Sequence, residues 1–402
     1  MKIKTNEVVF REDLYPRFEA NQALIQKYAY SLEHLPPIKL SQNMILIDGY
    51  HRWKAHQLEE EPEIEADIVE VESEKELKKL AYMMNSNHGL QLKDNEKSSF
   101  AQEMIYEMSA AELAQLLCVT SRRIEQWTAT QRESIKDERN RKIVEHYLRA
   151  WNTSQGIAEI IGVDRKTVER IVDGQKRNIS EMSKDELKIY NVWNTGKQDN
   201  ATDSHFGSFP LVFMKNLLYY HTDPLDIVFD PFAGGGTTVD ACKEMFRRYY
   251  CTDRIVKPGR EKDILEHDIK NGLPDNLPKP KLVFLDPPYW KQAEGKYSDS
   301  KNDLGNMTLD DFYSSMDMLF KELTARKVER IVIVIAPTQY PNDMQFEDHI
   351  FKFNAMLNKY EIEMRYMLPY STQQYNGTMV DRAKGEKICL NIVRDLVVWR
   401  FK

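Results

Sequence analysis

The sequence of 402 residues predicts an α/β protein whose C-terminal half contains a doubly wound parallel sheet. The first observation behind this prediction is a series of short β-rich runs that alternate with helical stretches in that half. The second is residues 8–71, where short apolar runs mix with helical stretches and predict a separate small α/β domain. The third is residues 74–173, where glycine is sparse and the pattern is almost entirely helical. Because one hydrophobic core rarely organises a chain of this length, two or three domains are expected.

Composition excludes several classes of protein. Hydrophobic residues make up 42% of the chain and charged residues 30%, without low-complexity tracts, which is typical of a globular protein. No apolar run approaches the roughly 20 residues that a membrane helix needs. The N-terminus lacks the apolar core of a secretion signal, so a cytoplasmic protein without a membrane partner is expected. The four cysteines show no C-x-x-C spacing, and we therefore expect no metal site.

The first element with chemical character is the turn at Gly49, His51 and Arg52, where an apolar run passes into a helical stretch. Such a turn presents backbone N–H groups, a helix N-terminus and two side chains that can carry positive charge. The turn is therefore a candidate phosphate site.

Two helical pairs with short turns follow, at residues 111–127 and 154–172. We expect Thr120 or Ser121 to cap the second helix of the first pair. The second helices would expose polar side chains, namely those of Arg122, Arg123, Gln126, Arg165, Lys166 and Arg170. Recognition helices use such residues on base edges and phosphates, although any αα-hairpin has a similar periodicity and can serve packing alone.

Charge alone does not decide between these two interpretations. The chain carries a formal net charge of −7, so any contact with nucleic acid requires a local basic surface. Residues 121–178 contain 13 Arg plus Lys against 9 Asp plus Glu, a small excess that a solvated helix face would also explain.

A polar segment at residues 194–204 marks the next boundary, and the strands of the parallel sheet follow it. The expected strands are residues 225–229, 248–251, 282–285 and 330–336. Two further β-rich runs, residues 361–368 and 390–399, flank a long polar connection and are expected to pair as an antiparallel ending to the sheet.

Directly after the first of these strands, residues 230–238 form a glycine-rich turn before a helical stretch. Three glycines at a strand-to-helix turn let the backbone approach a ligand closely, although the G-x-G-x-x-G spacing is absent and a purely structural turn is the alternative. The next strand ends at Asp253, where a carboxylate meets ribose hydroxyls in the general logic of such folds.

A second motif follows residues 282–285, where an apolar strand stops at Asp286, Pro287, Pro288 and Tyr289. The prolines cannot continue a ladder, so they hold the end of the strand at the edge where open α/β sheets bind ligands. The alternative is an ordinary turn that ends a strand.

The two motifs, in this order and spacing, resemble the amino-methyltransferases of DNA over residues 193–402. The resemblance implies a Rossmann-like S-adenosylmethionine methyltransferase domain there. The patterns that precede it predict a small α/β domain at residues 1–90 and a helical region at residues 91–192. The resemblance also implies that Asp253 binds the ribose of the cofactor and that Asp268 and Ile269 approach its adenine. The full set of cofactor-binding positions implied is Phe206, Ser208, Pro210, Asp230, Pro231, Phe232, Gly234, Gly236, Thr237, Thr238, Asp253, Asp268 and Ile269.

The chemistry explains why such residues would be catalytic. The lone pair of an exocyclic amine is delocalised into its base, so a catalyst must accept hydrogen bonds from the amine and draw the nitrogen toward tetrahedral geometry. Asp286 and the backbone carbonyl of Pro287 can accept those bonds, with Pro288 fixing the turn. Transfer from a sulfonium is an in-line displacement that requires no metal. A base within a duplex must flip out to reach the site, and Tyr289 would stack on it.

The N-terminal segment resembles the ParB and sulfiredoxin-like fold at residues 14–18 and 47–55, which implies that Gly49, His51 and Arg52 bind a nucleoside triphosphate. A second motif of that family is only partly matched at residues 85–88, where its arginine is missing. The alternative is a fold that serves DNA docking or assembly into a homodimer without nucleotide chemistry.

Double-stranded DNA is the expected partner, and adenine N6 is favoured over cytosine N4 as the target. The family's large recognition domain is missing, since only residues 291–307 follow Trp290 before the next helical stretch. Sequence recognition is therefore expected before residue 193. Two other functions remain alternatives: a non-enzymatic ParB-like regulator that binds DNA, and an RNA methyltransferase.

Overall fold

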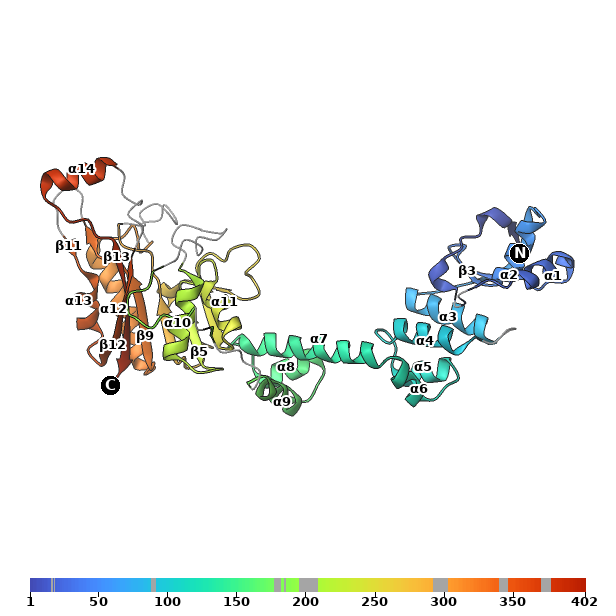
Figure 1. Ribbon diagram of the computed structural model, residues 1–402, viewed down its shortest axis with the longest axis horizontal. Helices are drawn as coiled ribbons and strands as arrows, with labels where there is room; N and C mark the ends of the chain where they lie inside the picture. The colour runs from blue at the N-terminus through green and yellow to red at the C-terminus, as the bar shows by residue number, and fades with distance from the viewer. Residues whose placement is uncertain are drawn as a thin grey trace. The chain divides into compact units, whose positions relative to one another are not determined.

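Figure 1 shows a computed structural model of the chain, which describes residues 1–15, 17, 19–87, 92–176, 182–183, 186–194, 209–291, 303–339, 346–369 and 377–402. These residues form two compact units, Met1–Arg139 and Asn140–Lys402. The division falls within helix α7 (Ala129–Leu148), inside the region predicted to be helical. The domain boundaries expected from the sequence remain predictions.

The first unit begins with a four-stranded sheet in the order β1-β4-β2-β3. Its strands are β1 (Lys2–Lys4), β2 (Ile38–Ser41), β3 (Leu46–Asp48) and β4 (Glu63–Val69), with helices α1 (Gln22–Ala29) and α2 (Tyr50–Leu58). Strands β2 and β4 are parallel, whereas β1 and β3 run antiparallel to their neighbours. Ile38, Leu40 and Trp53 are buried in the core of this domain, which confirms the predicted small α/β domain.

The rest of the first unit is helical, as predicted. It contains α3 (Glu74–Asn87), α4 (Asp94–Met104), α5 (Ala110–Leu116) and α6 (Ser121–Trp127). Met104, Leu113 and Ile124 have no exposed surface and share one apolar cluster with Tyr82. Short 3-10 helices lie at Thr5–Glu7, Glu12–Leu14, Leu32–His34 and, in the second unit, Ile269–Asn271.

The second unit contains a seven-stranded sheet in the order β12-β13-β9-β8-β5-β6-β7. Its strands are β5 (Ile227–Asp230), β6 (Arg248–Asp253), β7 (Leu265–Glu266), β8 (Leu282–Leu285), β9 (Arg330–Ile335), β12 (Tyr360–Pro369) and β13 (Val393–Phe401). Strands β5 to β9 are parallel, and β13 is antiparallel to both β9 and β12. The predicted strands and the antiparallel ending are confirmed, but β13 inserts between β9 and β12, an order that the sequence pattern does not reveal.

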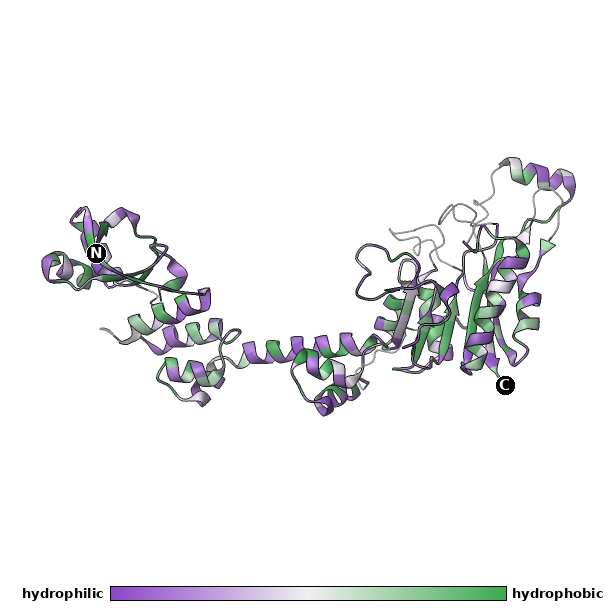
Figure 2. Ribbon diagram, turned by 180° about the vertical axis from the view of Figure 1, so that it is seen from behind, coloured by the Kyte–Doolittle hydropathy of each residue, from purple (hydrophilic) through white to green (hydrophobic). Residues whose placement is uncertain are grey.

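Alternation along these strands divides the apolar residues between two faces of the sheet. Val228 and Phe284 pack with α10 (Leu211–His221) and α11 (Thr237–Glu244) on one face. Phe229 and Val283 pack with α12 (Leu309–Ala325) and α13 (His349–Met356) on the other. Figure 2 shows these strands as predominantly hydrophobic, while the helices that flank them carry both hydrophobic and hydrophilic residues. This is the doubly wound arrangement predicted from the sequence.

The remaining elements of the second unit are α8 (Ser154–Ile161), α9 (Arg165–Gln175), β10 (Thr338–Gln339), β11 (Phe346–Glu347) and α14 (Gly377–Glu386). Across the described parts of the chain, none of the helices has the length and apolar character required to cross a bilayer. Nor do three or more His, Cys, Asp or Glu side chains gather at a potential metal site within those parts.

Candidate active site

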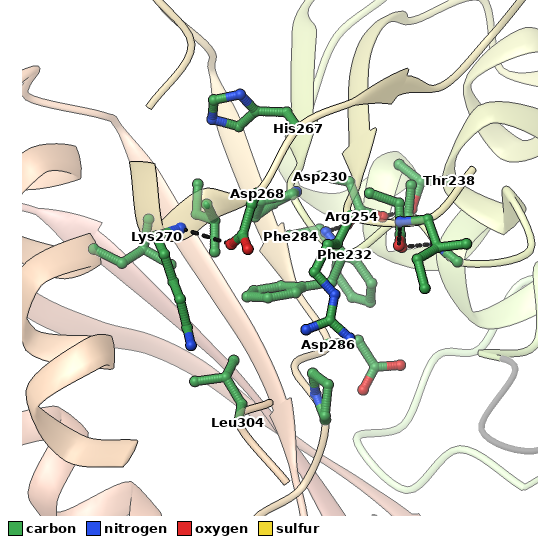
Figure 3. A pocket seen from close by; sticks show the side chains of 18 of the residues that line it. Asp230, Phe232, Thr238, Arg254, His267, Asp268, Lys270, Phe284, Asp286 and Leu304 are labelled. Atoms are coloured by element: carbon green, nitrogen blue, oxygen red, sulfur yellow. Dashed lines mark hydrogen bonds between the residues drawn. The ribbon is translucent and has the colours of Figure 1, made fainter. Parts of the chain in front are cut away.

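The acidic residues singled out in the sequence come together at the carboxyl edge of the parallel strands. Asp230 ends β5, Asp253 ends β6, Asp286 follows β8 and Asp268 follows β7. Because these strands are parallel, their carboxyl ends meet at one edge of the sheet. All four residues line one cavity of about 420 Å³, a volume typical of small-molecule sites. Figure 3 labels three of them, Asp230, Asp268 and Asp286.

Most of the predicted cofactor positions also line this cavity. They are Asp230, Pro231, Phe232, Gly234, Thr237, Thr238, Asp253, Asp268 and Ile269. Gly236 and Pro210 lie nearby as the residues that precede α11 and α10, respectively, without lining the cavity. Phe206 and Ser208 lie outside the described residues.

Asp230 shapes the glycine-rich turn from within. Its carboxylate accepts a hydrogen bond of 2.9 Å from the backbone N–H of Phe232 and one of 2.5 Å from the Thr238 hydroxyl. Burial raises the pKa of Asp230 to about 7, against the lowering effect of these two bonds. Gly236 adopts a φ of 89°, and a Cβ there would lie 3.0 Å from the guanidinium of Arg260, so the turn requires glycine at this position.

Asp253 connects two loops at the rim of the cavity. One carboxylate oxygen accepts a hydrogen bond of 2.8 Å from the backbone N–H of Gly234, and the other accepts one of 3.1 Å from that of Ile255. Each carboxylate oxygen has a second acceptor position. Asp253 can therefore hold the turn and still accept hydrogen bonds from a ligand.

Asp268 lies at another side of the same cavity (Figure 3). Its carboxylate accepts a hydrogen bond of 3.0 Å from the backbone N–H of Lys270 and thereby caps the short 3-10 helix that begins at Ile269. This cap presents a carboxylate and an apolar side chain together at the cavity wall.

Asp286 occupies the end of β8, where Pro287 is buried and Tyr289 is half-buried. The Tyr289 hydroxyl donates a hydrogen bond of 3.0 Å to the Asp286 carboxylate. Burial raises the pKa of Asp286 to about 6, while the positive charge of Arg394 and the hydrogen bond from Tyr289 act in the opposite direction. Asp286 and Pro288 line the cavity, whereas Pro287 and Tyr289 do not. In this conformation Tyr289 contacts the Asp286 carboxylate through its hydroxyl.

A buried network supports the end of this motif from behind. The Thr338 hydroxyl donates a hydrogen bond of 3.2 Å to the backbone carbonyl of Trp290, and a 2.9 Å hydrogen bond joins Thr338 to Nε2 of His349. His349 is 1% exposed, and burial lowers its pKa to about 4, so its imidazole is neutral at pH 7. The indole N–H of Trp290 donates to the carbonyl of Met307 at 2.8 Å. No local pattern indicated Thr338 or His349, because their partners are distant in sequence.

Thr338→Val is expected to lower kcat by about tenfold, because it removes the hydroxyl that holds the Trp290 carbonyl and shifts the Asp286 turn. The KM for cofactor should not change, since Thr338 does not line the cavity. Steady-state kinetics check this, with Thr338→Ser as the control that restores the hydroxyl. An impairment of Thr338→Ser as large as that of Thr338→Val would contradict the proposed positioning role.

The sequence analysis also missed an ion pair in the cavity wall. The guanidinium of Arg254 lies 3.0 Å from the carboxylate of Asp303, which is 4% exposed. Both residues line the cavity. The position of Arg254 directly after Asp253 was the one available signal, whereas Asp303 lies in the segment after Trp290 and could be placed only by the fold.

In the first unit, the candidate phosphate residues make contacts within their own domain. Gly49 has a φ of 103° before α2, and a Cβ there would lie 2.6 Å from the side chain of Ile38. Arg52 donates a hydrogen bond of 2.7 Å to Asp48, and Nε2 of His51 accepts one of 3.1 Å from the backbone N–H of Asn21. The adjoining cavity measures about 10 Å³. Binding of a nucleoside triphosphate there remains a prediction.

Both predicted helical pairs form. The Thr120 hydroxyl caps α6, Gly162 ends α8 with a φ of 75°, and Asp164 caps α9. The six predicted side chains are exposed: Arg122, Arg123, Gln126, Arg165, Lys166 and Arg170. Two of them have acidic partners, since Arg123 lies 2.8 Å from Asp94 and Arg165 lies 2.8 Å from Glu169.

Comparisons with solved structures find partial likenesses. The chromosome-partitioning protein ParB from Caulobacter crescentus, complexed to the centromeric parS site, has 15% identity and a TM-score of 0.26, over 43% of this chain and 92% of that chain. Precorrin-6y C5,15-methyltransferase from Geobacter metallireducens GS-15 has 14% identity and a TM-score of 0.31, over 51% of this chain and 96% of that chain. The 1,6-didemethyltoxoflavin-N1-methyltransferase of Burkholderia thailandensis has 12% identity and a TM-score of 0.30, over 48% of this chain and 78% of that chain.

No curated protein matches the chain. A family model described as DNA methylase matches residues 47–256, which is more than half of the chain and includes the glycine-rich turn and Asp253. The match ends before Asp286, so the second motif rests on its own geometry. The chain therefore belongs to the DNA methylase family.

Proposed function

We propose that this protein transfers a methyl group from S-adenosylmethionine to an exocyclic amine of a base in double-stranded DNA, with adenine N6 favoured over cytosine N4. The observation that carries the proposal is the single cavity lined by the glycine-rich turn, Asp253 and Asp286. A cofactor site and an acceptor for the amine are thus within reach of each other.

The residues around the cavity fit this cofactor. Asp253 supplies carboxylate oxygens for the ribose hydroxyls, and Asp268 with Ile269 supplies an acceptor and an apolar side chain for the adenine. Phe232 adds apolar surface, and the acidic lining favours a cation. When bound, the cofactor supplies an electrophilic methyl group on a sulfonium.

The chain's own contribution is to prepare the amine. Asp286, held by the Tyr289 hydroxyl, accepts a hydrogen bond from the amine. The backbone carbonyl of Pro287, which follows Asp286 but does not line the cavity in this conformation, is the proposed acceptor of the second. These bonds draw electron density back onto the nitrogen and orient it for in-line attack. With a pKa of about 6, Asp286 is mainly ionised at pH 7, as an acceptor must be.

The experiment that tests this function is incubation of the full chain with mixed-sequence duplex DNA and S-adenosylmethionine, followed by mass spectrometry of the nucleosides. N6-methyl-2′-deoxyadenosine is expected. N4-methyl-2′-deoxycytidine would correct the target, methylation of duplex RNA in preference to DNA in a parallel incubation would correct the substrate, and an unmodified nucleoside pool would overturn the proposal.

Asp253→Ala is expected to weaken cofactor binding by about tenfold to a hundredfold, the usual worth of a hydrogen bond to a charged group. The substitution removes the carboxylate partner of the ribose and also releases the backbone N–H of Gly234. Gly234→Ala should have a smaller effect, because a Cβ there meets only the Phe232 carbonyl at 3.8 Å, although the φ of 49° adds some strain. Calorimetric titration measures both affinities.

The matched control for Asp253→Ala is Asp275→Ala, which removes an exposed carboxylate outside the cavity and should leave affinity unchanged. If Asp253→Ala binds S-adenosylmethionine as tightly as this control, the cofactor has been misplaced.

A further inference from the structure

Two positively charged side chains lie on the same exposed face of α9. Lys166 and Arg170 are both exposed and lie one helical turn apart, on the side of α9 away from the buried Val168 and Val172. A helix in a helix-turn-helix pair that presents such a face is suited to duplex DNA. The question is which part of the DNA it can reach.

The α8–α9 pair is fixed to the sheet of the second unit. Its core of Ile157, Ala158, Val168 and Val172 packs against Leu225, which lies just before β5. The segment that leads into α8 is also attached, because the backbone N–H of Ala150 donates to the carbonyl of Tyr249 in β6 at 2.8 Å. The pair is therefore part of the same compact unit as the cavity.

Arg248 and Arg149 strengthen this attachment. Arg248, the first residue of β6, donates hydrogen bonds of 2.9 Å to the carbonyl of Tyr147 and 3.0 Å to that of Asn152. Arg149 is buried and lies 3.1 Å from Asp263. Charged contacts of this kind, without much access to water, hold the α7–α8 connection in one place.

These attachments lie at the amino edge of the parallel strands, whereas the cavity lies at their carboxyl edge. Leu225 precedes β5 and Arg248 begins β6, while Asp230 and Asp253 end the same strands. Five residues separate each pair, so the two edges are roughly 17 Å apart at about 3.3 Å per strand residue. For a duplex that runs along the strand direction from one edge to the other, this separation corresponds to roughly five base pairs, because a base pair occupies about 3.4 Å of the duplex axis.

From this placement, and resting on the function proposed above, we propose that α9 holds duplex DNA flanking the methylated base, at least about five base pairs away, and does not read the base pairs next to the target. Helix α9 is then an anchor for the DNA. Selection of the base itself falls to other residues.

The test compares methylation of two duplexes that carry the same target, once sequencing of methylated mixed-sequence DNA has located it. One is a hairpin-closed duplex with about four base pairs on each side of the base, and the other extends about 20 base pairs on each side. The variant Lys166→Ala/Arg170→Ala is compared with Lys352→Ala/Lys359→Ala, a control that removes two exposed charges elsewhere in the second unit.

The α9 variant should show a KM at least about tenfold above wild type on the long duplex and an unchanged KM on the short one, while the control matches wild type on both. An equal rise on both duplexes would mean that α9 reads the target site, and no rise on either would mean that α9 does not bind DNA. Both results overturn the inference. Absence of methyl transfer by the wild type on every duplex would instead overturn the proposed function and the inference with it.

Discussion

Asp286→Asn is expected to lower kcat for methyl transfer by about a thousandfold while S-adenosylmethionine binds with unchanged affinity. The substitution preserves shape but replaces an anionic acceptor at the carboxyl end of β8, where it should meet the amine. Because the loss concerns the amine rather than the sulfonium, it should appear in turnover. Single-turnover kinetics and calorimetric titration of the same preparation measure the two quantities.

Tyr289→Phe is the matched control, since it removes only the hydroxyl that donates to Asp286. Its kcat should fall far less than that of Asp286→Asn. Near-normal turnover by Asp286→Asn would refute the mechanism.

The same residue predicts a pH dependence. Burial raises the pKa of Asp286 to about 6, so the carboxyl is protonated below that pH and can no longer accept a hydrogen bond from the amine. The rate kcat/KM should therefore rise with pH through about 6 and then level off. Asp286→Asn should lose this rise in whatever activity remains, which distinguishes Asp286 from other groups that titrate.

Arg149→Met is expected to have the largest effect on stability, a loss of about 3 kcal/mol or more in the second unit. Arg149 is buried, its guanidinium lies 3.1 Å from Asp263 and 2.8 Å from Glu145, and Asp263 also accepts hydrogen bonds from Lys243 and Tyr249. Removing Arg149 takes away one of the two cationic partners that the largely buried Asp263 has among the described residues and leaves only Lys243, so part of the cost of burying this carboxylate is no longer offset. Thermal unfolding measures the loss of stability, and hydrogen exchange would locate this loss in Asn140–Lys402.

The comparison variant is Arg141→Met, in which an exposed arginine 3.3 Å from Glu145 is replaced. Exposed ion pairs contribute about 0–1 kcal/mol, so this variant should unfold close to wild type. Equal losses in the two variants would mean that the contacts of Arg149 add no more than those of a surface pair.

Much of the active site could be predicted because its chemistry is local. Strand β8 was predicted with the bounds observed, and Asp230, Asp253 and Asp286 each follow or end an apolar run. In a parallel sheet, residues at strand ends meet at one edge whatever the order of the strands. The spacing of the apolar residues and the residues that end each run are therefore enough to predict which carboxylates meet at the cavity.

The rest depends on contacts between distant segments. The hydrogen bond from Thr338 to Trp290 and the ion pair of Arg149 with Asp263 join residues with no shared local pattern. Leu148, at the end of α7, and Ala150, just after it, are buried in the apolar clusters of the second unit. A helix that leaves one unit and ends in the core of another has an ordinary amphipathic sequence, so its pattern does not indicate where it packs.

The place of β13 in the sheet has a consequence for how the protein is made. Val393–Phe401 (β13) lies between β9 and β12 in the sheet. Strands β9 and β12 therefore do not pair with each other, and both lack this partner until the ribosome has synthesised β13. Until residue 401 emerges, the nascent chain exposes unpaired strand edges, which are prone to aggregation. Completion of this sheet therefore requires β13, and a translation product interrupted shortly before β13 would keep these edges unpaired and be a substrate for chaperones and proteases.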